Sequence, residues 1–109
     1  MEFYNNLYVS DSLIDKKNSI IRQIKRKNAR HGIYIITLPH TKHNQLEFYS
    51  ASMLKQKVYD KDDLFIVGIA DGYFEAVELV RDIYDDILLD IEDNDIRRFI
   101  ESHRQKGGV

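Results

Sequence analysis

Hydrophobic positions near the start of the chain repeat with the period of a helix. Between residues 12 and 29, the apolar side chains fall within one arc when projected at about 100° per residue. They are Leu13, Ile14, Ile20, Ile21 and Ile24. Small polar residues at 10–12 are N-cap candidates, and Gly32 is a candidate stop. Lys17 falls inside the apolar arc, where its stem can lie on the core while its ammonium group reaches water. We predict a helix here, preceded by a flexible segment over residues 1–10.

Three later segments have the composition of β-strands. Residues 33–38 are β-branched and aromatic and end at Pro39, and residues 46–51 alternate apolar and polar side chains. The polar loop between them has hairpin length or slightly more, which predicts an antiparallel hairpin. Residues 64–70 are apolar on both faces, as expected of a central strand. Gly68 within this strand suggests that another group approaches the backbone closely.

The clearest amphipathic helix runs from residue 73 to residue 91. We expect its inward face to consist of Tyr73, Phe74, Ala76, Val77, Val80, Ile83, Tyr84, Ile87 and Leu88. Its outward face collects Glu75, Glu78, Asp82, Asp85 and Asp86.

Residues 52–63 have a weak pattern that fits a turn or two of helix. A cap at 93–95 predicts a short last helix through Phe99 and Ile100, followed by a frayed tail over 105–109.

The order of these elements predicts one α+β domain over residues 1–109. A three-stranded sheet cannot bury its own apolar surface, so the two main helices must pack on it. We expect a two-layer sandwich: a three-stranded, mainly antiparallel sheet, formed by the hairpin and the central third strand, covered by the N-terminal helix and the long C-terminal helix. The direction of the second strand relative to the third is left open by the sequence.

Composition removes several classes of protein. The chain has 109 residues, 43% hydrophobic and 31% charged, which is typical of one globular domain. It has no Cys, so there is no disulfide, thiolate metal site or thiol nucleophile. No apolar run reaches the roughly 18 residues of a membrane span, and no signal peptide is recognisable. We therefore expect a cytoplasmic protein with no membrane contact. The usage of Ile, Lys and Asp is typical of bacterial proteins from AT-rich genomes.

Charge is distributed unevenly along the sequence. Seven cationic residues and no acid lie between Lys16 and Arg30, whereas thirteen acids and two cations lie between Asp60 and Asp95. Like charges therefore recur at i, i+4 on both main helices, which costs a few tenths of a kcal/mol per pair. Besides a charge run that is only a solvated face, three compensations are open. The helices lie side by side with their charges along the seam, the cations meet a second copy or an acidic protein, or they meet nucleic acid phosphates.

An interaction surface is the best candidate site. Lys25, Arg26 and Arg30 project away from the apolar arc of the first helix, so we expect them to be exposed. Tyr34 and Tyr49, with Tyr59, would add an aromatic patch if they surface together on the outer face of the hairpin. Nucleic acid is disfavoured because the acidic part is repulsive and no aromatic residue is interleaved with the cations.

Candidate chemistry elsewhere is weak. His40 and His43 lie three positions apart in the hairpin loop with Glu47 nearby, but a zinc site needs further ligands. The segment 68–72 joins a strand to a helix as phosphate loops do, yet it lacks their glycine spacing, and Asp71 is explained as an N-cap. We expect no catalytic, cofactor-binding or metal-binding residue.

These features predict a non-catalytic protein-interaction or self-association module, with a protein partner or a homo-oligomer favoured over nucleic acid. Two alternatives stay open. One is a small-molecule-binding domain or enzyme with a pocket near the hairpin, around His40, His43 and Tyr34. The other is a nucleic-acid accessory protein that uses the basic N-terminal helix. A pocket with convergent polar groups would favour the first alternative, and strongly salt-dependent binding the second.

Overall fold

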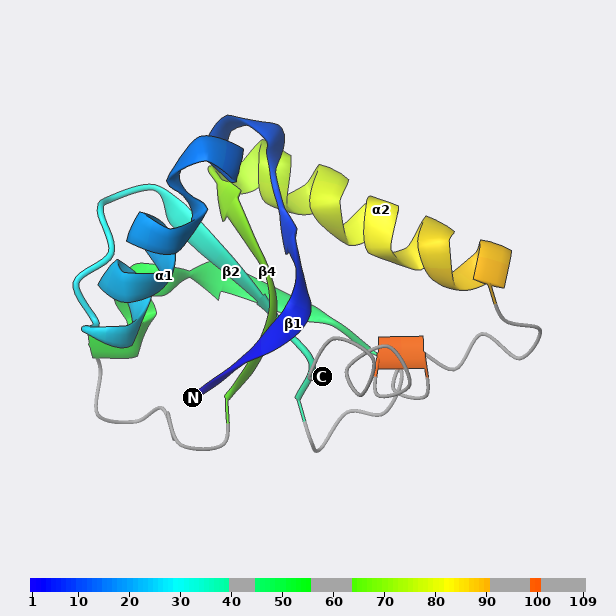
Figure 1. Ribbon diagram of the computed structural model, residues 1–109, viewed down its shortest axis with the longest axis horizontal. Helices are drawn as coiled ribbons and strands as arrows, with labels where there is room; N and C mark the ends of the chain where they lie inside the picture. Colours follow the sequence, from blue (N-terminus) through cyan, green and yellow to red (C-terminus); the bar gives the residue numbers. More distant parts are fainter. Residues whose placement is uncertain (40–44, 56–63, 91–98, 101–109) are drawn as a thin grey trace.

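The computed structural model describes residues 1–39, 45–55, 64–90 and 99–100 (Figure 1). Within these ranges, the main helices and strands follow one another in sequence order. They are strand β1 (Glu2–Val9), the 3₁₀ helix η1 (Asp11–Lys16), helix α1 (Lys17–Lys25), strands β2 (Ile33–Thr37) and β3 (Glu47–Ser50), the 3₁₀ helix η2 (Ala51–Lys55), strand β4 (Phe65–Asp71) and helix α2 (Tyr73–Asp90). Both main helices and the three expected strands are therefore present. The predicted tail over 105–109 lies outside the described residues.

The strands form one mixed four-stranded sheet in the order β1-β4-β2-β3. Strand β2 pairs antiparallel with both β3 and β4, which confirms the hairpin and the central position of β4. Strand β1 pairs parallel with β4. The expected three-stranded sheet was therefore one strand short. The direction left open by the sequence is parallel: β3 and β4 are both antiparallel to β2, which separates them in the sheet.

The additional strand lies in the segment that we expected to be flexible. Its register explains why its pattern is hard to see: Phe3 pairs with Ile66 and Tyr8 pairs with Gly68, so five steps on β1 face two on β4. Such an irregularity breaks the alternation of apolar and polar positions that identifies a strand. Backbone hydrogen bonds from Glu2 N to Leu64 O (2.8 Å) and from Ser10 N to Ile69 O (3.1 Å) fix both ends.

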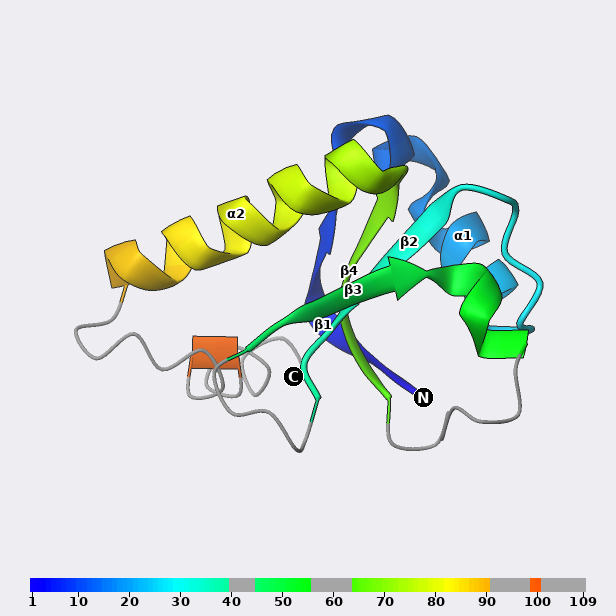
Figure 2. The ribbon, with the colours of Figure 1, turned by 180° about the vertical axis from the view of Figure 1, so that it is seen from behind.

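Helices cover both faces of the sheet, so the fold has three layers where we expected two. Helix α2 lies on one face, and α1, η1 and η2 lie on the other (Figures 1 and 2). The α2 side of the core contains Tyr4, Ile36, Leu38, Phe65, Val67, Ala76, Leu79, Ile83 and Ile87. The other side contains Leu7, Leu13, Ile20, Ile24, Ile33, Ile35, Leu54, Ile66 and Ile69. Apolar residues on both faces of β2 and β4 require this arrangement.

The N-terminal helix is shorter than its hydrophobic pattern suggested. It begins as the 3₁₀ turn η1, and α1 ends at Lys25, where Lys27 turns to a φ of 58°. Hydrogen bonds from Lys27 N to Ile24 O and from Asn28 N to Gln23 O close this end. The Ser10 side chain does not cap η1; its Oγ accepts the Asp71 N–H at 3.2 Å instead. The serine thus connects β1 to the end of β4.

Gly68 is the position in β4 where the close approach expected from the sequence is found. A Cβ atom there would lie 3.1 Å from Ile36 Cδ1 and 3.2 Å from Leu79 Cδ2. We expect Gly68→Ala to lower the free energy of unfolding by about 1–3 kcal/mol, because the core must shift to admit the methyl group. Urea denaturation measures the change, with the exposed position Asn18→Ala in α1 as control. Equal midpoints for the two variants would contradict this packing.

Candidate functional site

The basic and acidic helices lie on opposite faces of the sheet. Helix α1 packs through Ile20 and Ile24 on the sheet face of Ile35, whereas α2 packs through Ile83 on the face of Ile36. Their charges therefore cannot meet along a common seam, and the first of the three compensations was wrong. The hydrophobic patterns of the helices do not encode this outcome, because either face of a sheet can receive an amphipathic helix.

The three cations proposed from the sequence are all exposed, as predicted. Arg30 Nη2 forms an ion pair with Asp71 Oδ2 at 3.2 Å, where the side chains are 43% and 32% exposed. Lys25 Nζ lies 5.6 Å from the centre of the Phe3 ring. The Arg26 guanidinium has no ion-pair partner in the described ranges. Two of the three cations are thus directed towards the ends of the sheet.

Tyr34 and Tyr49 lie on opposite faces, so the tyrosine patch expected on the hairpin does not form between them. Tyr34 pairs with Ser50, and Tyr49 pairs with Ile35. The tyrosines are thus one position out of register, and successive strand residues point to opposite faces. Tyr34 packs on the α2 side and Tyr49 on the α1 side. Tyr59 lies outside the described residues.

An exposed apolar flank of α2 lies beside Tyr34. The Tyr73 ring is 6.2 Å from Tyr34, 5.6 Å from Phe48 and 6.1 Å from Phe74, measured between ring centres. We call the exposed residues of this surface the apolar flank: Tyr73, Phe74, Val77 and Leu88. Phe74 is 82% exposed and Leu88 is 60% exposed. The sequence had assigned all four residues to the inward face, and that was wrong.

The inward face of α2 is instead centred on four other residues: Ala76, Leu79, Ile83 and Ile87. Leu79, which is absent from the inward face expected from the sequence, is 6% exposed. The apolar residues of α2 span an arc too wide for one contact with a sheet, so part of them must face outwards. This excess width was the signal in the sequence that could have revealed the flank.

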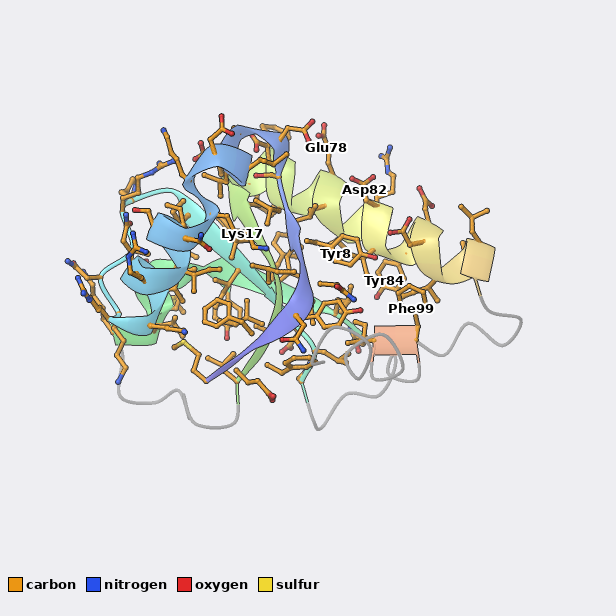
Figure 3. All side chains as sticks on the ribbon, in the orientation of Figure 1. Tyr8, Lys17, Glu78, Asp82, Tyr84 and Phe99 are labelled. Carbon is orange, nitrogen blue, oxygen red and sulfur yellow. The ribbon has the colours of Figure 1, made fainter. Side chains whose placement is uncertain are left out.

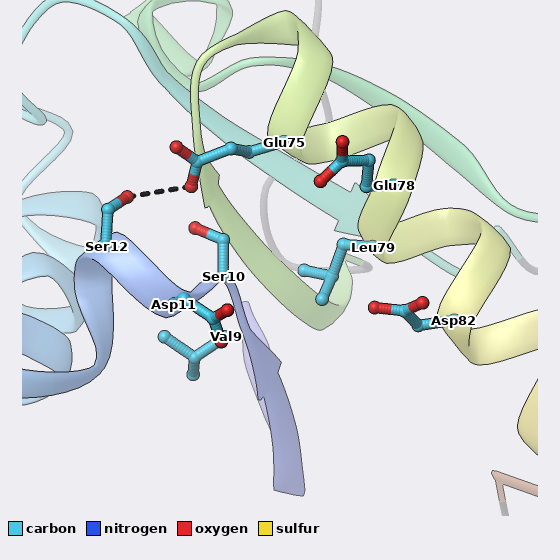
Figure 4. Close-up of a pocket in the computed structure, with 8 residues that line it drawn as sticks. All are labelled: Val9, Ser10, Asp11, Ser12, Glu75, Glu78, Leu79 and Asp82. Carbon is cyan, nitrogen blue, oxygen red and sulfur yellow. Dashed lines mark hydrogen bonds between the residues drawn. The ribbon is translucent and has the colours of Figure 1, made fainter.

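The opposite flank of α2 is acidic and borders a pocket of about 310 Å³ beside η1 (Figure 4). The pocket is lined by Val9, Ser10, Asp11, Ser12, Glu75, Glu78, Leu79 and Asp82. Ser12 Oγ donates a hydrogen bond to Glu75 Oε1 at 2.7 Å. Four carboxylates among the lining residues would repel an anion. In the described ranges, no group of three or more acidic or His side chains is placed to hold a metal.

This pocket is distant in sequence from the one suggested near the hairpin. It is built from η1, α2 and the end of β1, none of which the hairpin hypothesis used. Of the three residues named for that hypothesis, Tyr34 packs against Phe48 and Tyr73, while His40 and His43 lie outside the described residues.

Tyr8 connects β1 to the acidic flank of α2. The Tyr8 side chain points from β1 towards α2 (Figure 3), and its hydroxyl donates to Asp86 Oδ2 at 2.7 Å. Burial, followed by the hydrogen bond and charge of Asp86, raises the pKa of the Tyr8 hydroxyl above its usual value of 10. The folded state thus favours the protonated phenol.

The sign of this pKa shift predicts a loss of stability in alkali. The contribution of Tyr8 is complete below its unfolded pKa of about 10 and is lost as the pH rises above it. We expect Tyr8→Phe to cost about 1 kcal/mol at neutral pH, because one hydrogen bond is lost. Above pH 10 the variant should lose less stability per pH unit than the parent. Unfolding curves between about pH 7 and 11 check this, and parallel pH profiles would contradict it.

The sequence matches no protein-family model, no curated protein and no solved structure in the comparisons made with it. Within the described residues, no helix has the length and apolar character needed to span a membrane. By its fold, the chain belongs to the class of small α+β domains, and its mixed four-stranded sheet lies between helices.

Proposed function

We propose that this domain is a non-catalytic protein-interaction or self-association module that binds through the apolar flank of α2. The observation that carries the proposal is the exposure of Phe74 and Leu88 on a helix whose opposite apolar face, centred on Leu79 and Ile83, is buried. Contiguous exposed apolar surface is characteristic of protein-binding sites. Aromatic side chains also contribute disproportionately to binding energy at such sites.

The neighbourhood of the flank supports a preformed surface. Tyr73 is held by ring contacts with Tyr34 and Phe48, which belong to strands β2 and β3. A surface that is ordered before binding loses less conformational entropy when a partner binds. At about 100° per residue the flank projects away from Glu75 and Asp82 of the pocket, whereas Glu78 and Asp85 border it.

Site-specific photocrosslinking tests this proposal. A photoreactive phenylalanine analogue is placed at position 74 and, as a matched control, at the exposed position 19 of α1. We expect crosslinked protein from position 74 in the cells that make the protein, and none above background from position 19. Equal yields from the two positions, or none from position 74, would contradict an interaction site on α2.

A second candidate function is nucleic-acid binding through α1, and the separation of the helices favours it. The sheet keeps the carboxylates of α2 on the face opposite Arg22, Lys25 and Arg26. The repulsion that disfavoured phosphate contacts is therefore weaker than the sequence alone suggested.

The variant Lys25→Gln/Arg26→Gln/Arg30→Gln distinguishes the two functions. We expect it to keep the fold within about 1 kcal/mol, since exposed charges contribute little to stability. If α1 binds phosphates, the parent should bind duplex DNA with a steep salt dependence. The variant should then flatten the slope of log K against log salt by up to about three units. Absence of duplex binding at low salt would exclude this second candidate.

A further inference from the structure

We propose that the partner of the apolar flank is a second copy of this chain, bound through an antiparallel α2–α2 contact about a two-fold axis near Arg81. This inference rests on the proposed function and names the partner of the same surface. It is carried by the spacing of the exposed residues of α2 and by the position of the single cation of that helix.

The exposed residues follow the spacing of a helix–helix seam. Steps of three, four, three and four residues separate five positions, which we call the seam: Phe74, Val77, Arg81, Tyr84 and Leu88. At about 100° per residue they fall within an arc of about 80°. This is the a/d pattern by which two helices pack at a shallow angle. Four of the five are exposed, and the partly buried Tyr84 anchors the seam through its hydroxyl, which accepts the Leu46 N–H at 3.3 Å.

The seam is self-complementary when it is reversed. Arg81 is its middle position, so a two-fold axis there places Phe74 opposite Leu88 of the partner subunit and Val77 opposite Tyr84 of the partner subunit. Both ends of the contact then join apolar or aromatic side chains. A two-fold contact of this kind uses one patch twice, and it closes at the dimer.

The charges fit the same arrangement. Arg81 is the only cation of α2, and it stands between Glu78 and Asp85 along the helix. All three side chains are exposed, and none has an ion-pair partner in the described part of the chain. Around a two-fold axis, each Arg81 meets carboxylates of the partner subunit, so four acids surround the two arginines. A foreign partner would need the same carboxylates at the centre and apolar residues at both ends.

The contact is small, which sets the affinity range in which to look. The fourteen steps along the helix from Phe74 to Leu88 span roughly 21 Å. Such a contact lies at the lower end of specific protein interfaces, so we expect a dissociation constant in the micromolar range. The parent chain should be mostly monomeric at low micromolar concentration and dimeric near about 1 mM.

Sedimentation equilibrium with a charge-swap pair is the decisive experiment. The parent should approach twice its 12.9 kDa mass with increasing concentration. Arg81→Glu and the double variant Glu78→Arg/Asp85→Arg should each stay monomeric, because either change places like charges around the axis. An equimolar mixture of the two variants should dimerise again, at least as tightly as the parent. Arg22→Glu, the same charge change at an exposed position of α1, should leave dimerisation unchanged.

Each other outcome counts against the dimer. A parent that is monomeric at 1 mM, Arg81→Glu with the dissociation constant of the parent, or a mixture that stays monomeric would overturn it. Loss of the dimer in Arg22→Glu would instead place the contact on α1. If the dimer fails while the probe at position 74 crosslinks a different protein, the interaction module stands and only the identity of its partner is wrong.

Discussion

Replacing Ile83 by Ala is expected to lower the free energy of unfolding by about 2–5 kcal/mol. Ile83 is fully buried on the inward face of α2, in the core that α2 forms with β2 and β4. The substitution removes buried apolar surface and leaves a cavity that the rigid sheet beneath can close only in part. Domains of this size have a total stability of about 5–15 kcal/mol, so the loss is a large fraction of it.

Leu89→Ala is the matched control for Ile83→Ala. Leu89 lies in the same helix but is 88% exposed, so the same kind of truncation should change stability by less than about 0.5 kcal/mol. Urea denaturation followed by circular dichroism measures both variants. Similar midpoints for the two would show that the face of α2 assigned to the core is wrong.

Removing residues 1–9 is expected to abolish cooperative folding. Without β1, one edge of β4 loses its parallel neighbour, and both core clusters lose a buried side chain of that strand. Tyr4 is 3% exposed on the α2 side, and Leu7 is 9% exposed on the α1 side. A segment that contributes to both halves of a small core cannot be removed without exposing each of them.

Two point variants test the same strand without shortening the chain. We expect Tyr4→Ala to cost about 3–5 kcal/mol and Leu7→Ala about 2–5 kcal/mol. Ile14→Ala in η1 is the control, because Ile14 is 57% exposed and should tolerate truncation. If residues 1–10 were a flexible tail, the truncated chain would keep its unfolding midpoint, and both point variants would match the control.

The sequence revealed the elements whose signals are local. The run of β-branched residues ending at Pro39 identifies β2, and the continuous apolar segment from Leu64 to Ala70 identifies β4 as an interior strand. The period of α2 located its start at Tyr73, as found. Strand β1 escaped detection because its irregular pairing with β4 disrupts the period of two, and because its partner is some sixty positions away.

The candidate site depended on information that no local pattern contains. Exposure of Lys25 followed from the period of α1, but the faces of Tyr34 and Tyr49 follow from their register across the hairpin. Likewise, α2 has more apolar residues than the sheet can cover. Which of them are left outside depends on the rotation of the helix about its axis, which Leu79 and Ile83 fix by packing on the sheet.

Local patterns alone therefore identify one α+β domain, a hairpin, a central strand and two helices of opposite charge, because period and composition act over a few residues. Packing of the assembled sheet places α1 and α2 on its opposite faces, adds β1 to its edge and leaves Phe74 facing outwards. These outcomes depend on contacts between residues far apart in the chain. The free energy of such contacts comes from close side-chain packing and apolar burial in the assembled core. Neither can be read from one segment of the sequence.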